Sequence, residues 1–267
     1  MNWDALESTL TAHVSERMLD LAHVRPGIRL LDLACGRGEP ALRAAHRVGE
    51  EGTVVACDLW RAALEGAQAK AEAQGLTNIT FIERDAAEAD ALCAPVDVVT
   101  MRWGLMYAAE PLRVLQSAHR ALKPDGLLVI ATWAEPERVP WWSLPRQAQR
   151  AFDAVPEVDF LVPSPFRYAS REVIERDLHA SHFELLHHEE MHADVVEAMS
   201  GEGIATWIRQ VLGRMCPQGH ISTWEQYVRN ACEAHRKSDG IIRLGGITHV
   251  ALARKAQSPK NIARTNS

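Results

Sequence analysis

The chain has 267 residues, of which 47% are hydrophobic and 24% are charged, as is typical of a globular protein that folds without disulfides or metals. Its net charge of −6 gives no electrostatic footprint for nucleic acid, which usually demands a basic face, and no apolar run approaches the roughly 20 residues that span a bilayer. The five cysteines are scattered without a C-x-x-C pair, and the first residues lack a signal-peptide pattern. We therefore expect a cytoplasmic protein with reduced thiols and no nucleic-acid or membrane partner.

The first half of the chain predicts a regular α/β arrangement. An apolar residue at every fourth position from Leu6 to Met18 predicts an amphipathic helix. Short apolar runs then alternate with helical segments as far as Trp133, which predicts a three-layer, Rossmann-like fold with a mostly parallel sheet. The predicted strands are "RLLDLA" (29–34), "TVVACD" (53–58), "ITFIERD" (79–85), "VDVVTMR" (96–102) and "LLVIATW" (127–133).

The second half breaks this alternation. Seven of the sixteen aromatic residues lie between Trp133 and Tyr168, in a segment that is also rich in proline. We expect two helical lid insertions, whose aromatic side chains include Trp207 in the later one. The predicted organisation is an N-terminal helical segment (1–28), a cofactor-binding core (29–133), an aromatic lid insertion (134–170), a core continuation (171–193), a second helical insertion (194–240), a closing strand (241–255) and a disordered tail (256–267).

The loop "LLDLACGRGEP" (30–40) follows the first predicted strand and contains Gly36 and Gly38. A strand that runs through such a loop into a helix places backbone N–H groups where a ligand can bind. Ala41 is a candidate for the third small residue of a G-x-G-x-x-G/A fingerprint. The loop alone therefore does not separate a nicotinamide cofactor from another adenosine-bearing ligand.

Two acidic residues end the next two strands. Asp58 can accept hydrogen bonds from both hydroxyls of a ribose, or it can simply cap the following helix. Asp85 can accept from an adenine amino group while the N–H of Ala86 donates to the ring, although alone it reads as an ordinary loop acid. Because carboxyl ends of parallel strands meet at one edge, these residues and the glycine loop predict an adenosine site there.

These motifs, followed by "DVVTMRWGLMYAAEPLRVLQSAHRALKPDGLLVIATW", resemble in order the motifs of class I S-adenosylmethionine-dependent methyltransferases over about residues 10–133. They are most similar to the small-molecule branch that includes ubiquinone/menaquinone and natural-product methyltransferases. The resemblance implies S-adenosyl-L-methionine as cofactor. It also implies an antiparallel last strand, for which residues 183–190 and 247–255 are well placed, whereas a nicotinamide enzyme would repeat a second β-α-β-α-β half.

The resemblance assigns the methionine end of the cofactor to the first and fourth strands. Asp32 is implied to face its amino group, and the backbone near Arg102 to contact the methionine part. Gly36 and Gly38 would let the backbone pass close to the cofactor. Ala34 stands where the family usually has its first glycine, so its methyl group narrows the loop.

At the adenosine end the resemblance implies that Asp58 binds the ribose hydroxyls and that Leu59 packs on adenine. Asp85 and Ala86 would read the adenine edge. No metal is expected, because the neighbouring histidines at 187 and 188 point to opposite faces of a strand.

The predicted activity is methyl transfer to a small, aromatic or polyketide-like acceptor in secondary metabolism, with oxygen or carbon favoured over nitrogen. No catalytic residue is predicted, because a sulfonium methyl is already activated and alignment is the main task. The alternatives are a non-methylating, pericyclase-like protein, an NAD-dependent oxidoreductase, and a binding domain on a decayed fold; a homodimer is left open. The substrate-binding candidates are Trp3, Tyr107, Trp141 and Trp142.

Overall fold

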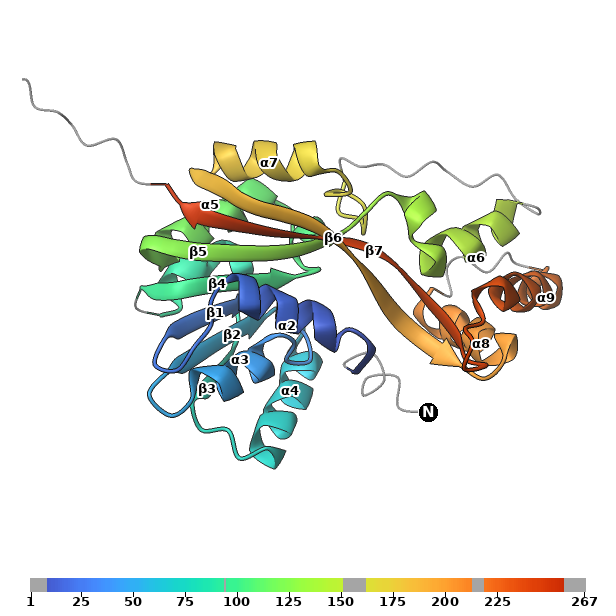
Figure 1. Cartoon of the computed structure of the whole chain (residues 1–267), viewed down its shortest axis with the longest axis horizontal. Helices are drawn as coiled ribbons and strands as arrows, with labels where there is room; N and C mark the ends of the chain where they lie inside the picture. Colours follow the sequence, from blue (N-terminus) through green and yellow to red (C-terminus); the bar gives the residue numbers. More distant parts are fainter. Residues whose placement is uncertain (1–8, 94, 151–161, 213–218, 257–267) are drawn as a thin grey trace, which may run out of the picture.

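The computed structural model describes residues 9–93, 95–150, 162–212 and 219–256. Seven strands form one sheet in the order β3-β2-β1-β4-β5-β7-β6, in which β7 runs opposite to the other six and so pairs antiparallel with both β5 and β6 (Figure 1). This confirms the predicted Rossmann-like fold class with its antiparallel last strand. The strands are β1 (Arg29–Leu33), β2 (Thr53–Asp58), β3 (Ile79–Glu83), β4 (Val96–Arg102), β5 (Leu122–Trp133), β6 (Phe183–Ala198) and β7 (Ile242–Lys255).

Helices cover both faces of the sheet, with α2, α3 and α4 on one side and α5 and α7 on the other (Figure 1). Their apolar residues recur at helical spacing, so each helix buries one stripe against the strands. The serine before α7 caps it, since the Ser170 hydroxyl accepts from the N–H of Val173. The helices are α2 (Ala12–Leu21), α3 (Ala41–Val48), α4 (Arg61–Ala73), α5 (Pro111–Ala121), α6 (Pro140–Arg150), α7 (Arg171–Ala180), α8 (Gly201–Val211) and α9 (Ile221–Cys232).

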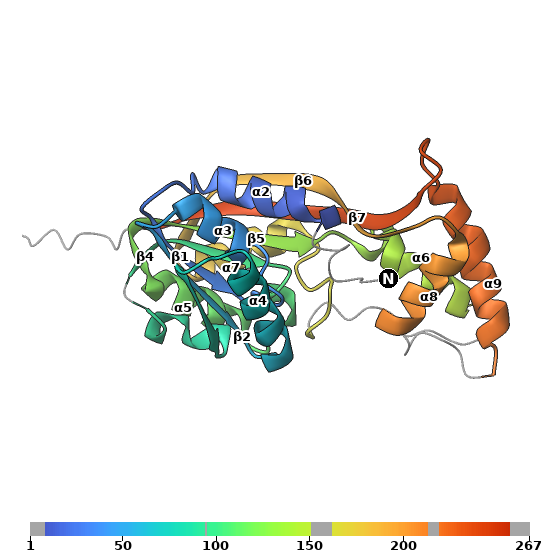
Figure 2. The ribbon, with the colours of Figure 1, turned by 90° about the horizontal axis from the view of Figure 1, so that it is seen from below.

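The strands β6 and β7 extend beyond the rest of the sheet. Pairing between β5 and β7 stops at Thr248, whereas β6 and β7 stay paired as far as Ala198 and Ile242. The resulting two-stranded ribbon leads to α8 and α9, which gather with α6 at one end of the molecule (Figure 2). We call α6, α8 and α9 the cap.

The ribbon places the end of β6 later than the sequence predicts, since "FELLHHEE" ends at residue 190 and the second insertion was expected from 194. The strand continues because residues up to Ala198 find partners in β7 across more than 40 residues of chain. Gly245 permits this close pairing, since a Cβ there would lie 1.9 Å from the Ala193 carbonyl oxygen.

The predicted turn "KPDG" (123–126) lies inside β5 as an irregularity. Pairing with β4 shifts register between Val96 and Val98, opposite this segment, and Asp125 has a φ of +61°. A bulge of this kind carries extra residues without ending the strand, so β5 starts at Leu122 and not at residue 127.

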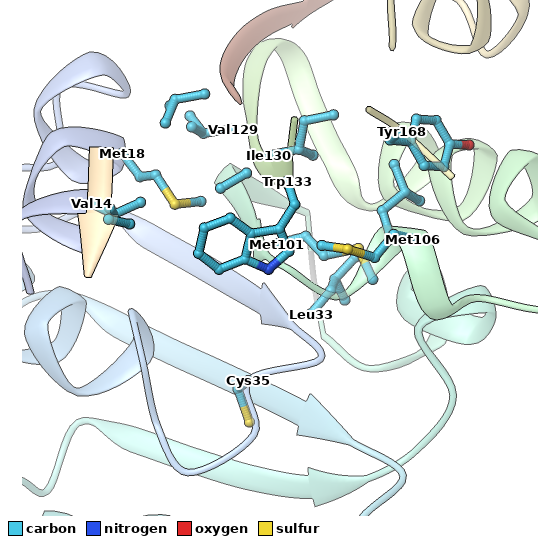
Figure 3. Packing of buried hydrophobic residues seen from close by; sticks show 14 of the residues in the cluster. Val14, Met18, Leu33, Cys35, Met101, Met106, Val129, Ile130, Trp133 and Tyr168 are labelled. Atoms are coloured by element: carbon cyan, nitrogen blue, oxygen red, sulfur yellow. The ribbon is translucent and has the colours of Figure 1, made fainter. Parts of the chain in front are cut away.

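The core between α2 and the sheet includes Val14 and Met18 of the helix and Val129 and Trp133 of β5 (Figure 3). The cap has its own centre: the Trp224 side chain is fully buried, and its indole N–H donates to the Pro145 carbonyl at 3.1 Å. Among the helices of the described residues, none is both long enough and apolar enough to cross a membrane. The predicted tail from residue 257 onward lies outside the described residues.

Candidate functional site

The loop between β1 and α3 adopts a left-handed backbone at three positions. Ala34, Gly36 and Gly38 have φ values of +52°, +51° and +101°. A Cβ at Gly38 would lie 2.7 Å from the Leu42 side chain, so that glycine is required by packing against α3. A Cβ at Gly36 would meet no atom within 4 Å. Only Gly36 therefore presents bare backbone to open space.

That open space belongs to a cavity of about 500 Å³ between the carboxyl edge of the sheet and the cap. Its walls come from the glycine loop, the ends of β2, β4 and β5, α4, β6, α6 and α8. Cavities of this size hold small organic ligands. The lining residues are Ala34, Cys35, Gly36, Arg37, Glu39, Trp60, Lys70, Arg102, Trp103, Tyr107, Trp133, Trp141, Val195, Trp207 and Val211.

Asp58 ties this loop to the end of β2. One carboxylate oxygen accepts from the N–H of Gly36 and the other from the N–H of Trp60, both at 2.8 Å. The bond to Trp60 is not the helix cap that the sequence offered as the alternative role, because Trp60 is itself the residue before α4 and that helix has no side-chain cap. Each carboxylate oxygen can still accept another hydrogen bond, so a ribose role stays compatible with this geometry. Leu59 beside it is 66% exposed and available for packing.

Asp85 lies at the neighbouring strand end, as predicted from the parallel sheet. Its carboxylate accepts from the N–H of Ala87 at 2.8 Å and so begins a short 3₁₀ helix from Ala86 to Ala91. The pairing of β2 with β3 sets Asp58 opposite Glu83, two residues before Asp85. Asp58, Leu59, Asp85 and Ala86 thus share one edge, next to the cavity but outside its lining.

Asp32 lies beneath the loop and not on the cavity wall. It is fully buried, and its carboxylate accepts from the Thr100 hydroxyl at 2.7 Å. Burial raises the pKa of Asp32 to about 7, although the Thr100 hydrogen bond and the Arg102 guanidinium favour the ionised form. The Arg102 side chain reaches the cavity, donates to the Thr11 hydroxyl at 2.7 Å, and lies 4.6 Å from the centre of the Trp103 ring.

Tryptophans dominate the side of the cavity that faces the cap. Trp103 and Trp133 stack with ring centres 4.6 Å apart and planes 9° from parallel, and Trp141 packs edge-on against Trp133 at 5.7 Å. Trp103 has a φ of +54°, a strained conformation for a bulky residue, and its indole N–H donates to the Thr248 hydroxyl at 2.9 Å.

The structure brings two of the four predicted substrate-binding residues, Tyr107 and Trp141, to the cavity. Trp142 lies behind Trp141 and packs on Phe166, away from the lining, while Trp3 lies outside the described residues. The candidate set omitted Trp103 and Trp133. Their positions, directly after β4 and at the end of β5, were the available signal, because ligands of such sheets bind outside the carboxyl ends of the strands.

A sequence model for a methyltransferase domain matches residues 25–161, half of the chain. The chain belongs to this family. The nocamycin O-methyltransferase of Saccharothrix syringae is 32% identical over 57% of this chain and 55% of its own length. The ubiquinone/menaquinone biosynthesis C-methyltransferase of Shewanella sp. (strain ANA-3) is 32% identical over 45% and 48%. The chain thus spans about half the length of the curated relatives it matches.

A SAM-dependent methyltransferase from Aquifex aeolicus shares the fold of this methyltransferase-domain chain. The two agree with a TM-score of 0.57 over 95% of this chain and 97% of the other, at 17% identity. Together with the family match, this confirms the resemblance to methyltransferases that the ordered motifs indicate. It favours the methyltransferase over the alternative of an NAD-dependent oxidoreductase.

The residues at the sheet edge fit the cofactor of such an enzyme. Open space beside Gly36 accepts a ligand against bare backbone, and Asp58 offers carboxylate oxygens next to it. Within the described residues, no three His, Cys, Asp or Glu side chains gather as a metal site would require. His187 bonds to Glu189 and His188 to His249, so the two neighbours use different faces of β6.

Proposed function

We propose that this methyltransferase-domain protein transfers a methyl group from S-adenosyl-L-methionine to a small aromatic or polyketide-like acceptor. The observation that carries the proposal is the single cavity that runs from the glycine loop to the tryptophans of the cap. One end of it offers bare backbone at Gly36, and the other offers the flat apolar faces of Trp141 and Trp207. Such a cavity suits two ligands held end to end.

In this proposal, residues of the chain bind the cofactor and orient it toward the acceptor. Asp58 would accept from the ribose, Leu59 would pack on adenine, and Asp85 with Ala86 would read the adenine edge. Asp32, Ala34 and Gly38 would shape the methionine end, since they set the charge and the backbone of the loop below it. The cofactor supplies an activated methyl group, so the protein has only to align the acceptor and exclude water.

Transfer to oxygen or to carbon agrees equally well with the relatives, one of which is named as an O-methyltransferase and the other as a C-methyltransferase. We favour these two acceptor atoms over nitrogen because the cationic side chains of Arg37, Lys70 and Arg102 line the cavity. Acidic hydroxyls and the electron-rich carbons beside them suit such walls, whereas a cationic amine does not.

The test is to measure binding and turnover separately. Titration calorimetry with S-adenosylhomocysteine should show one site per chain, and NAD should give no heat of binding. Incubation with methyl-labelled S-adenosylmethionine and a set of flat phenols and hydroxyquinones should then produce labelled product and S-adenosylhomocysteine. Binding without turnover on any acceptor would favour the pericyclase-like alternative, and failure to bind S-adenosylhomocysteine would refute the proposal.

A further inference from the structure

Four of the tryptophans that line the cavity carry indole N–H groups that bond to nothing in the described part of the chain: Trp60, Trp133, Trp141 and Trp207. Trp60 is 58% exposed, so its N–H reaches solvent. Trp133 and Trp207 are only 4% and 6% exposed, yet no hydrogen bond uses the Nε1 atom of either. Other tryptophans do use theirs, since Trp103 donates to Thr248 and Trp224 to Pro145. Because the side chains of Trp133 and Trp207 are almost wholly buried and their N–H groups have no protein acceptor, a partner can reach them only from the cavity.

The two groups are also reachable from the cavity. The unpaired indole nitrogens of Trp141 and Trp142 are sealed from solvent, but those of Trp133 and Trp207 are not among the sealed atoms. Both side chains line the cavity, Trp133 from the end of β5 and Trp207 from α8 in the cap. In Figure 3 the indole nitrogen of Trp133 lies on the side of the ring away from Val129, which belongs to the same strand.

The rings are fixed in place before any ligand binds. Trp133 stacks on Trp103 and meets Trp141 edge-on, so its ring cannot turn without disturbing two neighbours. Trp207 is 6% exposed and lies among the buried residues of α8, a helix that packs against α9 in the cap. A donor held by packing loses little freedom on binding, which is the condition for a recognition group.

The charges of the cavity wall point to the same kind of ligand. Arg37, Lys70 and Arg102 line the cavity. Among its described lining residues, Glu39 alone carries a carboxylate, and that carboxylate accepts from the Arg43 guanidinium at 2.9 Å. No histidine belongs to this described lining. An indole N–H can only donate a hydrogen bond, and arginine and lysine side chains also only donate. The side chains of this wall therefore offer hydrogen-bond donors and positive charge, but few hydrogen-bond acceptors.

We propose that Trp133 and Trp207 are a pair of specificity-determining donors for the methyl acceptor. Their N–H groups bind two oxygens of a flat, apolar molecule, one a carbonyl and the other an ionised, acidic enol or phenol. One donor comes from the sheet and one from the cap, so a bound acceptor joins the two regions. This inference rests on the proposed function, because it assigns the ligand at the cap end of the same cavity.

The test observes the indole N–H groups directly. The full chain, labelled with ¹⁵N-tryptophan and saturated with S-adenosylhomocysteine, is titrated with 4-hydroxycoumarin, a flat acidic enol with a carbonyl. The N–H resonances of Trp133 and Trp207 should move downfield, whereas that of Trp224, already bonded to Pro145, should stay in place. The flat cation of 4-aminoquinoline, which offers donors, should bind about tenfold or more weakly.

Matched variants separate this inference from the proposed function. Trp133→Phe and Trp207→Phe keep a ring but remove the donor, so each should weaken 4-hydroxycoumarin binding about tenfold. Trp224→Phe, the same replacement inside the cap, should not. All three should keep S-adenosylhomocysteine affinity, the readout of the cofactor site. Equal binding of both probes, binding without movement of either resonance, or no binding of 4-hydroxycoumarin to the saturated protein would overturn the inference while leaving the cofactor site standing.

Discussion

The carboxyl edge of β1–β3 and the cap are built on different physical principles. At the sheet edge, backbone geometry and short polar contacts fix the arrangement, as in the bonds of Asp58 to the N–H groups of Gly36 and Trp60. In the cap, large aromatic side chains do this, with Trp224 fully buried at its centre. The difference teaches that the end of the cavity at the glycine loop is held by main chain and the end at the tryptophans by side chains.

The two regions also connect to the molecule differently. The sheet edge belongs to five parallel strands that helices cover on both faces. The cap, in contrast, extends from the sheet at the end of the ribbon formed by β6 and β7 (Figure 2). A region attached through few elements can open without unfolding the rest. We therefore expect changes in the cap and changes at the sheet edge to have separable effects.

The largest effect should come from Trp224→Ala. Removing this buried ring should cost the cap about 3–5 kcal/mol of stability, since it leaves a void and an unpaired Pro145 carbonyl. Hydrogen exchange should show α8 and α9 losing protection while β1 and β4 keep theirs, with S-adenosylhomocysteine affinity almost unchanged. Equal loss of protection in the sheet would mean that cap and sheet unfold as one unit.

Gly36→Val should act in the opposite way. The branched side chain is strained at a φ of +51° and projects into the cavity, so we expect S-adenosylhomocysteine affinity to fall about a hundredfold or more while the protein still folds. Gly75→Val is the matched control, because Gly75 also has a left-handed φ, +68°, and open space around it, but lies outside the cavity lining. Calorimetry and thermal unfolding of both variants separate strain from ligand exclusion.

The sequence predicted the sheet half well because its signals are local. The predicted spans 53–58 and 96–102 are the observed bounds of β2 and β4, since each is a buried apolar run between turn residues. The end of β6 was missed because its last residues pair with a segment that contains Gly245 and Gly246, which weaken a strand pattern. Pairing between residues so far apart in the chain produces no pattern in the sequence around residues 191–198 that would predict a strand.

The site residues also differ in whether local sequence signals could predict them. Tyr107 and Trp141 were predicted and line the cavity, but nothing local told Trp141 from Trp142, its neighbour on α6 that turns away. Trp133 was counted among the aromatic residues without a role, although its place at the end of β5 carried the information. The roles assigned to Asp58 and Asp85 stay predictions, since here both acids bond to backbone N–H groups.

Asp58→Ala tests the assigned ribose role at the sheet edge. Loss of a charged acceptor should weaken S-adenosylhomocysteine binding about tenfold or more by calorimetry. Glu88→Ala removes another acid near this edge, one that pairs with Arg84 at 3.1 Å on the surface, and should leave affinity unchanged. If Asp58→Ala leaves the dissociation constant unchanged, Asp58 has only a structural role, which is to bond to the N–H groups of Gly36 and Trp60.

The smallest effect concerns Ala34, the alanine where the family usually has its first glycine. At a φ of +52° its methyl group costs roughly 1 kcal/mol in backbone strain, and a glycine would relieve this at the expense of a more flexible unfolded chain. Ala34→Gly should therefore raise the free energy of unfolding by under about 1 kcal/mol. His23→Gly, also at +52° but outside the cavity lining, should stabilise similarly without touching affinity. If only Ala34→Gly changes S-adenosylhomocysteine binding, the methyl group narrows the cofactor loop; if neither variant is stabilised, packing outweighs backbone strain in this fold.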